Sequence, residues 1–275
     1  MSLPALAPIV GLLVLLELSA GTMAMTLIVD LLGEVGRGFM GTTALICAAI
    51  LGCALALAAM LPSPSDLLHE DVAAGSVASM DHWAVALLLG ILLYAFMTAA
   101  GTDSARRVVG TAATVGGFVA VERAAVAFGT PLGSVGSALI TFVPAALMCG
   151  AALAGMLLGH WYLISPDLTF RPLRRAIYTM FIALGVQATA LMVVLATASS
   201  RARDDLLGPR YGLSFWLLVV GTGLIFTAAV NGLTLYFARI RANQPATAML
   251  YVLIISVLMG VIPAHLLYFL SAVPV

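Results

Sequence analysis

Ionisable side chains that interrupt long apolar runs are the residues of this sequence best suited to chemistry. Glu17 lies near the centre of the first run, Glu122 and Arg123 lie together in a later one, and His82 and His265 belong to two others. Carboxyl and imidazole groups exchange protons, and a guanidinium group can polarise a carbonyl oxygen. Because such groups are costly in hydrocarbon, they are functional candidates by default.

Glu17 lies deep in its apolar run. It is about 14 residues into the run, which is roughly 20 Å along a helix axis. A carboxyl group at that depth is either neutral or paired and facing the interior of a helix bundle. The following Ser19-Ala20-Gly21-Thr22 segment permits close helix packing. We therefore expect Glu17 to face another helix, as a proton relay or as a protonated group bonded to a backbone carbonyl.

Glu122 and Arg123 are adjacent, and successive helix positions diverge by about 100°. We therefore predict that they do not face each other and that each needs another partner. His82 and His265 have comparable depth and could supply one for Glu122. A cluster of histidine and carboxylate near one membrane face suits quinol oxidation, in which the head group loses protons as electrons move. Alternatively, Arg123 extends to the lipid head groups.

The run Gly159-His160-Trp161-Tyr162-Leu163 is the most distinctive local motif. Trp161 and Tyr162 are typical of the head-group zone of a membrane and are candidate contacts for a cofactor. His160 could ligate the iron of a heme b or hydrogen-bond a quinone carbonyl. A hydrogen bond from His160 to a loop carbonyl is the structural alternative.

Heme binding would need histidines paired across facing helices. Of the four histidines, His69 lies in a loop and His160 has no histidine on its own side of the membrane. At most, His82 and His265 could bracket one heme b. The cysteines match no zinc or iron–sulfur spacing, so we expect small apolar residues and no metal site at Cys47, Cys53 and Cys149.

Eight apolar runs must position these side chains. A helix needs about 20 apolar residues to cross a hydrocarbon core of roughly 30 Å, and 63% of the 275 residues are hydrophobic while 9% are charged. The sequence therefore predicts an all-α integral membrane protein. The expected spans are Pro4–Val29, Thr42–Leu61, His82–Ala100, Val108–Phe128, Val135–Ile164, Leu173–Ala198, Leu213–Phe237 and Ala246–Val273.

The basic residues, all 12 of them arginine, divide unevenly between the two sides of this predicted membrane. One side has Arg37, Arg106, Arg107, Arg171, Arg174, Arg175, Arg239 and Arg241, and the other has Arg201, Arg203 and Arg210. Short cytoplasmic loops are enriched in arginine, so both termini are expected outside a bacterial cytoplasmic membrane. The outer side also collects acidic residues, as a docking surface or as solvated loops: Asp66, Glu70, Asp71, Asp81, Asp204 and Asp205.

The spans divide into two predicted four-helix bundles, residues 1–131 and 132–275. A shift of 134 residues aligns Leu18-Ser19-Ala20-Gly21 with Ala152-Leu153-Ala154-Gly155, and Arg37 with Arg171. Either an internal duplication or chance similarity between apolar segments explains this match.

The eight-span layout, the Ala20-Gly21 element and the Arg37-Gly38 loop together resemble the NrfD and polysulfide reductase membrane-subunit family. The resemblance covers the general layout and about 40 N-terminal residues. It implies a quinone near the outer face, generally no heme, and electron exchange with an attached iron–sulfur subunit. The matching polar positions of the implied quinone site, in the first bundle, are Glu17, His82, Glu122 and Arg123.

We therefore predict a quinone-binding membrane subunit of a respiratory oxidoreductase, with menaquinone or ubiquinone as ligand. Glu122 or His82 would exchange protons with the quinone, Arg123 would polarise a carbonyl oxygen, and Glu17 would relay protons. The expected partners are lipid and an iron–sulfur or cytochrome subunit, with no nucleic acid. The alternatives are a heme b-bearing membrane anchor and a proton-coupled secondary transporter, in which Asn231 would lie near the substrate.

Overall fold

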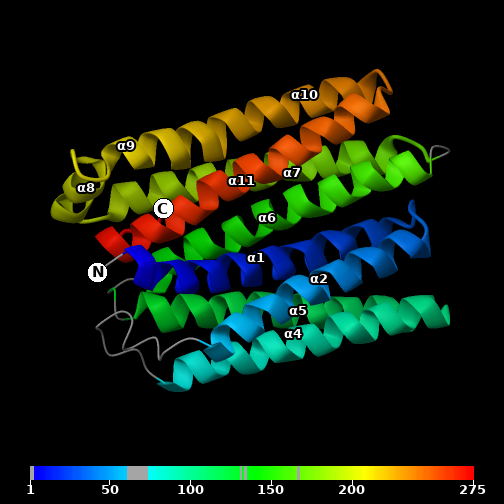
Figure 1. Ribbon diagram of the computed structural model, residues 1–275, viewed down its shortest axis with the longest axis horizontal. Helices are drawn as coiled ribbons and strands as arrows, with labels where there is room; N and C mark the ends of the chain where they lie inside the picture. The colour runs from blue at the N-terminus through cyan, green and yellow to red at the C-terminus, as the bar shows by residue number, and fades with distance from the viewer. Residues whose placement is uncertain (1–2, 61–73, 131, 133–134, 166–167) are drawn as a thin grey trace.

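Long hydrophobic helices make up the computed structural model, which describes the chain apart from residues 1–2, 61–73, 131, 133–134 and 166–167 (Figure 1). Within this described part there is no strand, and eight helical segments are long and apolar enough to cross a membrane. The prediction of an all-α membrane fold is therefore confirmed. The helices are α1 (Leu3–Leu32), α2 (Arg37–Met60), α4 (Ala74–Ala100), α5 (Asp103–Gly129), α6 (Val135–Ile164), α7 (Arg171–Thr197), α8 (Ser200–Leu207), α9 (Gly212–Ser214), the π-helical η1 (Phe215–Phe226), α10 (Thr227–Arg239) and α11 (Asn243–Ser271).

Several helices begin before their apolar runs do. Helix α2 starts at Arg37 instead of Thr42, and α5 starts at Asp103 instead of Val108. A helix satisfies backbone groups in the polar interface as well as in hydrocarbon, so its turns continue past the apolar core. The short helix α8 is not predicted from the sequence; the Ser199 hydroxyl caps it by accepting a hydrogen bond from the Ala202 amide at 3.3 Å.

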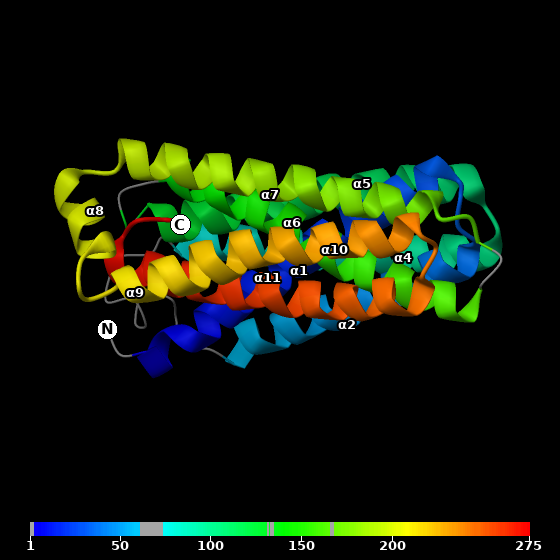
Figure 2. The same ribbon diagram turned by 90° about the horizontal axis from the view of Figure 1, so that it is seen from above.

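Both chain termini lie at one end of the molecule, which we call the terminal end (Figure 1). The α1–α2, α4–α5, α6–α7 and α10–α11 connections lie at the opposite end, which we call the arginine end (Figure 2). The eight arginines of the richer predicted side belong to these four connections and the helix ends beside them. Helix α8, with Arg201 and Arg203, lies at the terminal end.

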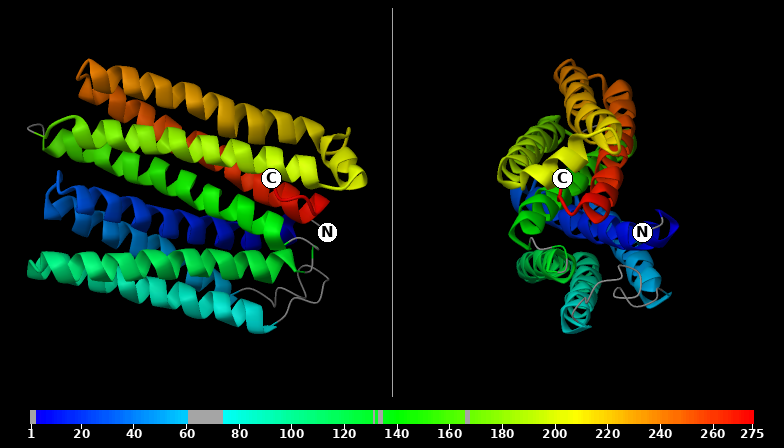
Figure 3. Two further views of the ribbon diagram at one scale, coloured as in Figure 1. Left: turned by 180° about the vertical axis from the view of Figure 1, so that it is seen from behind. Right: turned by 90° about the vertical axis from the view of Figure 1, so that its left-hand side faces the viewer.

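Helices α1 and α6 occupy the centre of the molecule. Helix α1 packs against α2, α5, α6 and α11, and 83% of its most apolar segment is buried, against 28% for α4. In Figure 3, α7, α10 and α11 lie on one side of the central pair, and α2, α4 and α5 lie on the other. Side chains on α1 can therefore meet partners from both halves of the chain.

Glycines bring the backbones of α1 and α6 into contact. A Cβ atom added at Gly21 would overlap the carbonyl group of Ala146, and one added at Gly150 would overlap the backbone of Gly21. The close packing predicted for the Ala20-Gly21 element is therefore confirmed. Gly223 of η1 and Gly260 of α11 make a second close approach, less tight than the first, in which an added Cβ atom would overlap the other glycine's Cα atom.

Candidate functional site

Glu17 and His265 meet between α1 and α11. Oε2 of Glu17 lies 2.8 Å from Nε2 of His265, and the two side chains are only 1% and 3% exposed. The prediction that Glu17 faces another helix is confirmed. Its partner is the histidine that the sequence analysis considered for Glu122. The two residues are 248 positions apart, and helix packing alone brings them together.

One aromatic ring packs against the imidazole of His265 and is itself held by a second. The Phe142 ring meets it edge-on, with centroids 4.9 Å apart, and also contacts the Tyr268 ring at 5.7 Å. The Tyr268 hydroxyl in turn donates to the carbonyl oxygen of Phe128 at 3.3 Å. These contacts fix the orientation of the imidazole, so its Nε2 atom remains directed at Glu17.

One oxygen of the Glu17–His265 pair is not used within the described residues. Oε1 of Glu17 is buried and has no hydrogen-bond partner there. A buried acceptor without a partner is costly, because it has lost its bonds to water. The pair can therefore hold a proton between Oε2 and Nε2 and still accept a hydrogen bond at Oε1.

An apolar groove runs along α1 and α11 beside this pair, and we call it the α1–α11 groove. It measures about 590 Å³, and its lining includes Val14 and Leu18 of α1 with Ile262 and Leu266 of α11. Leu18 and Leu266 directly follow Glu17 and His265 in the sequence. Ile262 is 43% exposed, so the groove opens at the lipid-facing surface. Neither Glu17 nor His265 lines the groove itself, so a lipid-soluble molecule there would contact the residues next to the pair and not the pair's own polar atoms.

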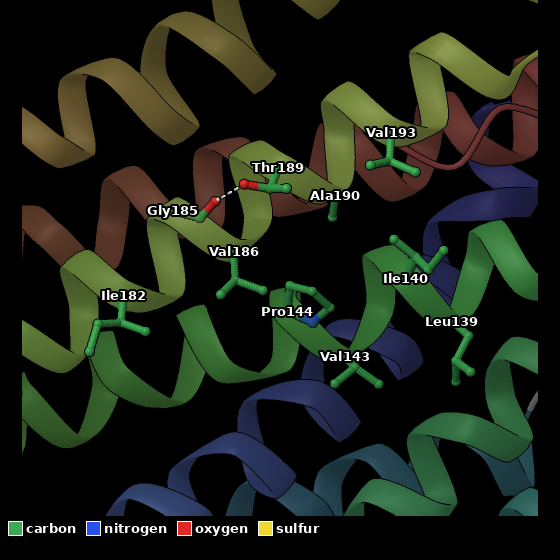
Figure 4. Close-up of a pocket in the computed structure, with 10 residues that line it drawn as sticks. All are labelled: Leu139, Ile140, Val143, Pro144, Ile182, Gly185, Val186, Thr189, Ala190 and Val193. Atoms are coloured by element: carbon green, nitrogen blue, oxygen red, sulfur yellow. Dashed lines mark hydrogen bonds between the residues drawn. The ribbon is translucent and has the colours of Figure 1, made fainter.

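A second apolar groove separates α6 from α7 (Figure 4). It measures about 820 Å³ and is lined by residues such as Val143, Pro144 and Ile182. None of its lining residues is ionisable, and the Thr189 hydroxyl is bonded to the Gly185 carbonyl at 2.8 Å. The α1–α11 groove likewise has no ionisable lining residue, but only in that groove are lining residues the sequence neighbours of a buried ionisable pair. The α6–α7 groove therefore provides a comparison.

Glu122 and Arg123 bond to each other, so the prediction that they face apart is wrong. Nε of Arg123 lies 2.8 Å from Oε2 of Glu122, and the side chains are 41% and 34% exposed. The 100° between successive positions applies to the Cα–Cβ directions, and the long arginine side chain bends back across that angle. Neither His82 nor His265 is the partner of Glu122 in this arrangement.

His82 and His160 are both exposed. Nδ1 of His82 lies 2.6 Å from the Ala78 carbonyl oxygen one turn earlier, and Nδ1 of His160 lies 3.4 Å from the Tyr251 hydroxyl. His82 is on α4 and His265 is on α11, and α1 and α6 lie between these helices (Figure 1). The geometry therefore does not fit a heme b held between His82 and His265. His69 lies outside the described residues.

Trp161 and Tyr162 support the packing at the arginine end. The Trp161 ring meets the Phe39 ring edge-on at 6.0 Å and lies against Gly38. Tyr162 is buried, and its hydroxyl donates to the Thr169 carbonyl at 2.5 Å. These two residues attach α2 and the α6–α7 connection to α6, and neither lines one of the two apolar grooves.

A buried ion cluster joins α1, α4 and α5 near the arginine end. It is not predicted from the sequence. Asp30 is 1% exposed and accepts hydrogen bonds from Nε and Nη2 of Arg106 at 2.8 and 2.5 Å. The Tyr94 hydroxyl donates to the same carboxylate at 2.8 Å. Arg106 also contacts Asp103 at 3.0 Å, and Asp103 binds Arg37 at 2.9 Å.

Asp30 is missed because it lies one residue beyond the expected end of the first span. The apolar pair Leu31-Leu32 after it is a signal that the helix continues past the carboxylate. Both carboxylate oxygens of Asp30 are bonded, which is typical of a structural ion pair. Asn231 links α10 to α7, since its amide nitrogen donates to the Ile177 carbonyl at 3.0 Å, while its buried Oδ1 atom has no hydrogen-bond partner among the described residues.

Glu17 and His265 are therefore the described residues that best combine burial, proton chemistry and an adjacent groove. Within the described part of the chain, no three His, Cys, Asp or Glu residues gather closely enough to hold a metal ion. Comparison of the chain with protein-family models, curated proteins and solved structures finds no match.

Proposed function

We propose that this chain is the membrane subunit of an electron-transfer complex in a bacterial cytoplasmic membrane, and that it binds quinone or quinol in the α1–α11 groove. The observation that carries the proposal is the buried Glu17–His265 pair beside that groove. An apolar groove of about 590 Å³ is within the usual size of small-molecule sites, roughly 300–1,000 Å³. The lipid-facing opening suits a ligand with an isoprenoid tail.

The proton chemistry of the pair matches what a quinone requires. Oxidation of a quinol releases two electrons and two protons. The electrons pass to a redox centre of the partner iron–sulfur or cytochrome subunit, and the Glu17–His265 pair accepts one proton while the other leaves toward the terminal end. Oε1 of Glu17 has no hydrogen-bond partner among the described residues and would accept the quinol proton. Because Glu17 does not itself line the groove, the quinol hydroxyl reaches this oxygen only when the side chain of Leu18 or Leu266 moves aside. In quinone reduction the same steps run in reverse.

Glu17 and His265 are better placed for proton exchange than Glu122 and His82. Glu122 and Arg123 neutralise each other on α5, and His82 is exposed on α4. The groove lies along the first half of α1, toward the terminal end. That position agrees with the outer-face quinone site that the family resemblance implies.

Quinone binding is tested with the purified chain in lipid nanodiscs and a photoreactive azidoquinone, with labelled peptides identified by mass spectrometry. Saturable labelling of α1 and α11 is expected. Ile262→Trp fills the groove and should reduce this labelling by about tenfold, equivalent to about 1.4 kcal/mol. Ile182→Trp, which places the same bulk in the α6–α7 groove, is the matched control and should leave it unchanged. If the two substitutions reduced the labelling equally, quinone would not bind in the α1–α11 groove.

Proton exchange is tested in the native complex with Glu17→Gln and His265→Gln. Both variants keep a polar side chain of similar size, so quinone labelling should remain. Quinone-linked turnover should fall by roughly 10²–10⁴-fold, the usual contribution of a general acid or base. Unchanged turnover in both variants would show that the pair is not the proton carrier.

A proton-coupled secondary transporter is the second candidate. It is favoured by two buried side-chain oxygens of membrane helices that have no hydrogen-bond partner among the described residues, Oε1 of Glu17 and Oδ1 of Asn231. Buried carboxylates within membrane helices often belong to proton pathways. This alternative predicts proton-linked uptake by the isolated chain in liposomes, with no partner subunit.

A further inference from the structure

A basic pocket lies at the arginine end, between the α6–α7 and α10–α11 connections. It measures about 630 Å³, and its charged lining is Arg171, Arg174, Arg239 and Arg241. Arg171 is the first residue of α7 and Arg239 is the last of α10. The pocket therefore lies where these helices leave the apolar part of the structure, at the level of lipid head groups.

The positive charge of this basic pocket is not balanced within the described residues. None of its four arginines lies within 4.0 Å of a carboxylate oxygen there, whereas the neighbouring Arg175 is paired with Glu34 at 2.9 Å. Arg239 instead donates to the Tyr178 hydroxyl at 3.3 Å. Asp167, outside the described residues, is the one acidic residue of the α6–α7 connection, so the arginines outnumber it by three.

One backbone feature supports an anion site here. Arg241 has a φ of 58°, in the left-handed region where glycine is the usual residue after a helix, so an arginine side chain is kept there at a conformational cost. The N-terminus of helix α7 adds little attraction for an anion, because Pro172 has no amide hydrogen and the amides of Leu173 and Arg174 bond to the Tyr162 hydroxyl and the Phe170 carbonyl.

We infer that the basic pocket binds a phosphate-bearing anion. Guanidinium groups pair with phosphate oxygens in a two-pronged arrangement, and basic pockets between membrane helices hold phospholipid head groups. The bound group would link the α6–α7 connection to the α10–α11 connection. Its source is either an anionic phospholipid or free phosphate, and this inference does not depend on quinone binding.

The test compares nanodiscs of phosphatidylcholine alone with nanodiscs that also contain phosphatidylglycerol, and adds inorganic phosphate to the former in a third arm. Thermal unfolding and retained lipid, measured by native mass spectrometry, are the readouts. Phosphatidylglycerol should raise the unfolding temperature and stay bound. Arg171→Gln combined with Arg174→Gln should reduce retention by about tenfold or more. Arg201→Gln combined with Arg203→Gln, at the terminal end, is the matched control.

Arg241→Gly separates binding from folding. Glycine adopts the left-handed conformation without strain, so this variant should unfold in phosphatidylcholine at the same temperature as the wild type or higher. It should nevertheless retain less phosphatidylglycerol. Stabilisation by phosphatidylglycerol alone identifies a lipid as the source, and stabilisation by inorganic phosphate identifies the free anion. The inference is wrong if neither anion stabilises the protein, or if the control pair reduces retention as much as the pocket pair.

Discussion

Asp30 is the single residue whose removal should destabilise this protein most clearly. Its carboxylate is bonded on both oxygens by Arg106 and Tyr94, and it is 1% exposed. Asp30→Leu would leave Arg106 buried with only the half-exposed carboxylate of Asp103, 3.0 Å away, as its counter-ion. We expect a cost of about 3 kcal/mol, the lower end of the range for a buried charge that loses its partner. Denaturant unfolding of the purified protein in mild detergent measures this loss. Adding Arg106→Leu should recover much of it, because a buried ion pair can be replaced by apolar residues at little cost. A double variant no more stable than Asp30→Leu alone would refute this explanation.

Removal of the Tyr162 hydroxyl should destabilise the protein less than removal of the Asp30 carboxylate. It donates to the Thr169 carbonyl at 2.5 Å and accepts weakly from the Leu173 amide at 3.4 Å. Tyr162→Phe should therefore cost about 0.5–1.5 kcal/mol of unfolding free energy. Tyr236 is 57% exposed, so Tyr236→Phe serves as the control and should change stability little. The unfolding temperatures of both variants are measured in the same detergent. Equal decreases in the two variants would contradict a stabilising role for the Tyr162 hydroxyl.

The contacts of Glu17, Glu122 and Arg123 show which side-chain contacts the sequence alone can predict. The depth of Glu17 in an apolar run predicts that it faces a helix, because hydrocarbon offers no other partner. The identity of that partner depends on the rotation of α11, which hydropathy does not report. The adjacent residues Glu122 and Arg123 illustrate the opposite error, since the backbone angle between them ignores the reach of an arginine side chain.

Among the elements, the crossing of α1 and α6 depends on the absence of two side chains. Gly21→Ala or Gly150→Ala would force the two backbones apart. Overpacking usually costs about 1–3 kcal/mol, and the cost here should reach or exceed the upper value, because the obstacle is backbone. Gly52→Ala in α2 is the matched control, with no atom within 4 Å of the added methyl group. It should be neutral or stabilise by up to about 1 kcal/mol. Unfolding by dodecyl sulfate in mixed micelles measures all three variants.

The number of membrane-length helices follows from the sequence, while their ends, their contacts and the short helix α8 do not. All eight expected spans correspond to membrane-length helices, because apolar runs of this length have few other stable states in lipid. The end of the first span at Val29 excluded Asp30, although α1 continues to Leu32. Hydropathy marks where hydrocarbon ends, and a helix is free to continue into the interface.

The whole molecule has its arginine-rich connections at one end and its termini at the other. Because arginine is retained in cytoplasmic loops, we expect both termini outside the cytoplasm. Alkaline phosphatase fused after Val275 should then be active in whole cells, and green fluorescent protein fused there should be dark. Fusions at the α6–α7 connection should give the reverse pattern. If green fluorescent protein fused at the C-terminus were fluorescent, the termini would face the cytoplasm, opposite to the orientation expected here.

The burial of α1 at the centre has a consequence for how the protein is made. This helix is synthesised before the other described helices, yet Arg106 follows Asp30 by 76 residues and His265 follows Glu17 by 248. The nascent chain must therefore enter the bilayer carrying two carboxyl groups whose counterparts are not yet synthesised. Any chain that ends before α11 leaves Glu17 without its imidazole. An unpaired carboxyl group at Glu17 would thus distinguish unfinished copies of the chain from complete ones during cellular quality control.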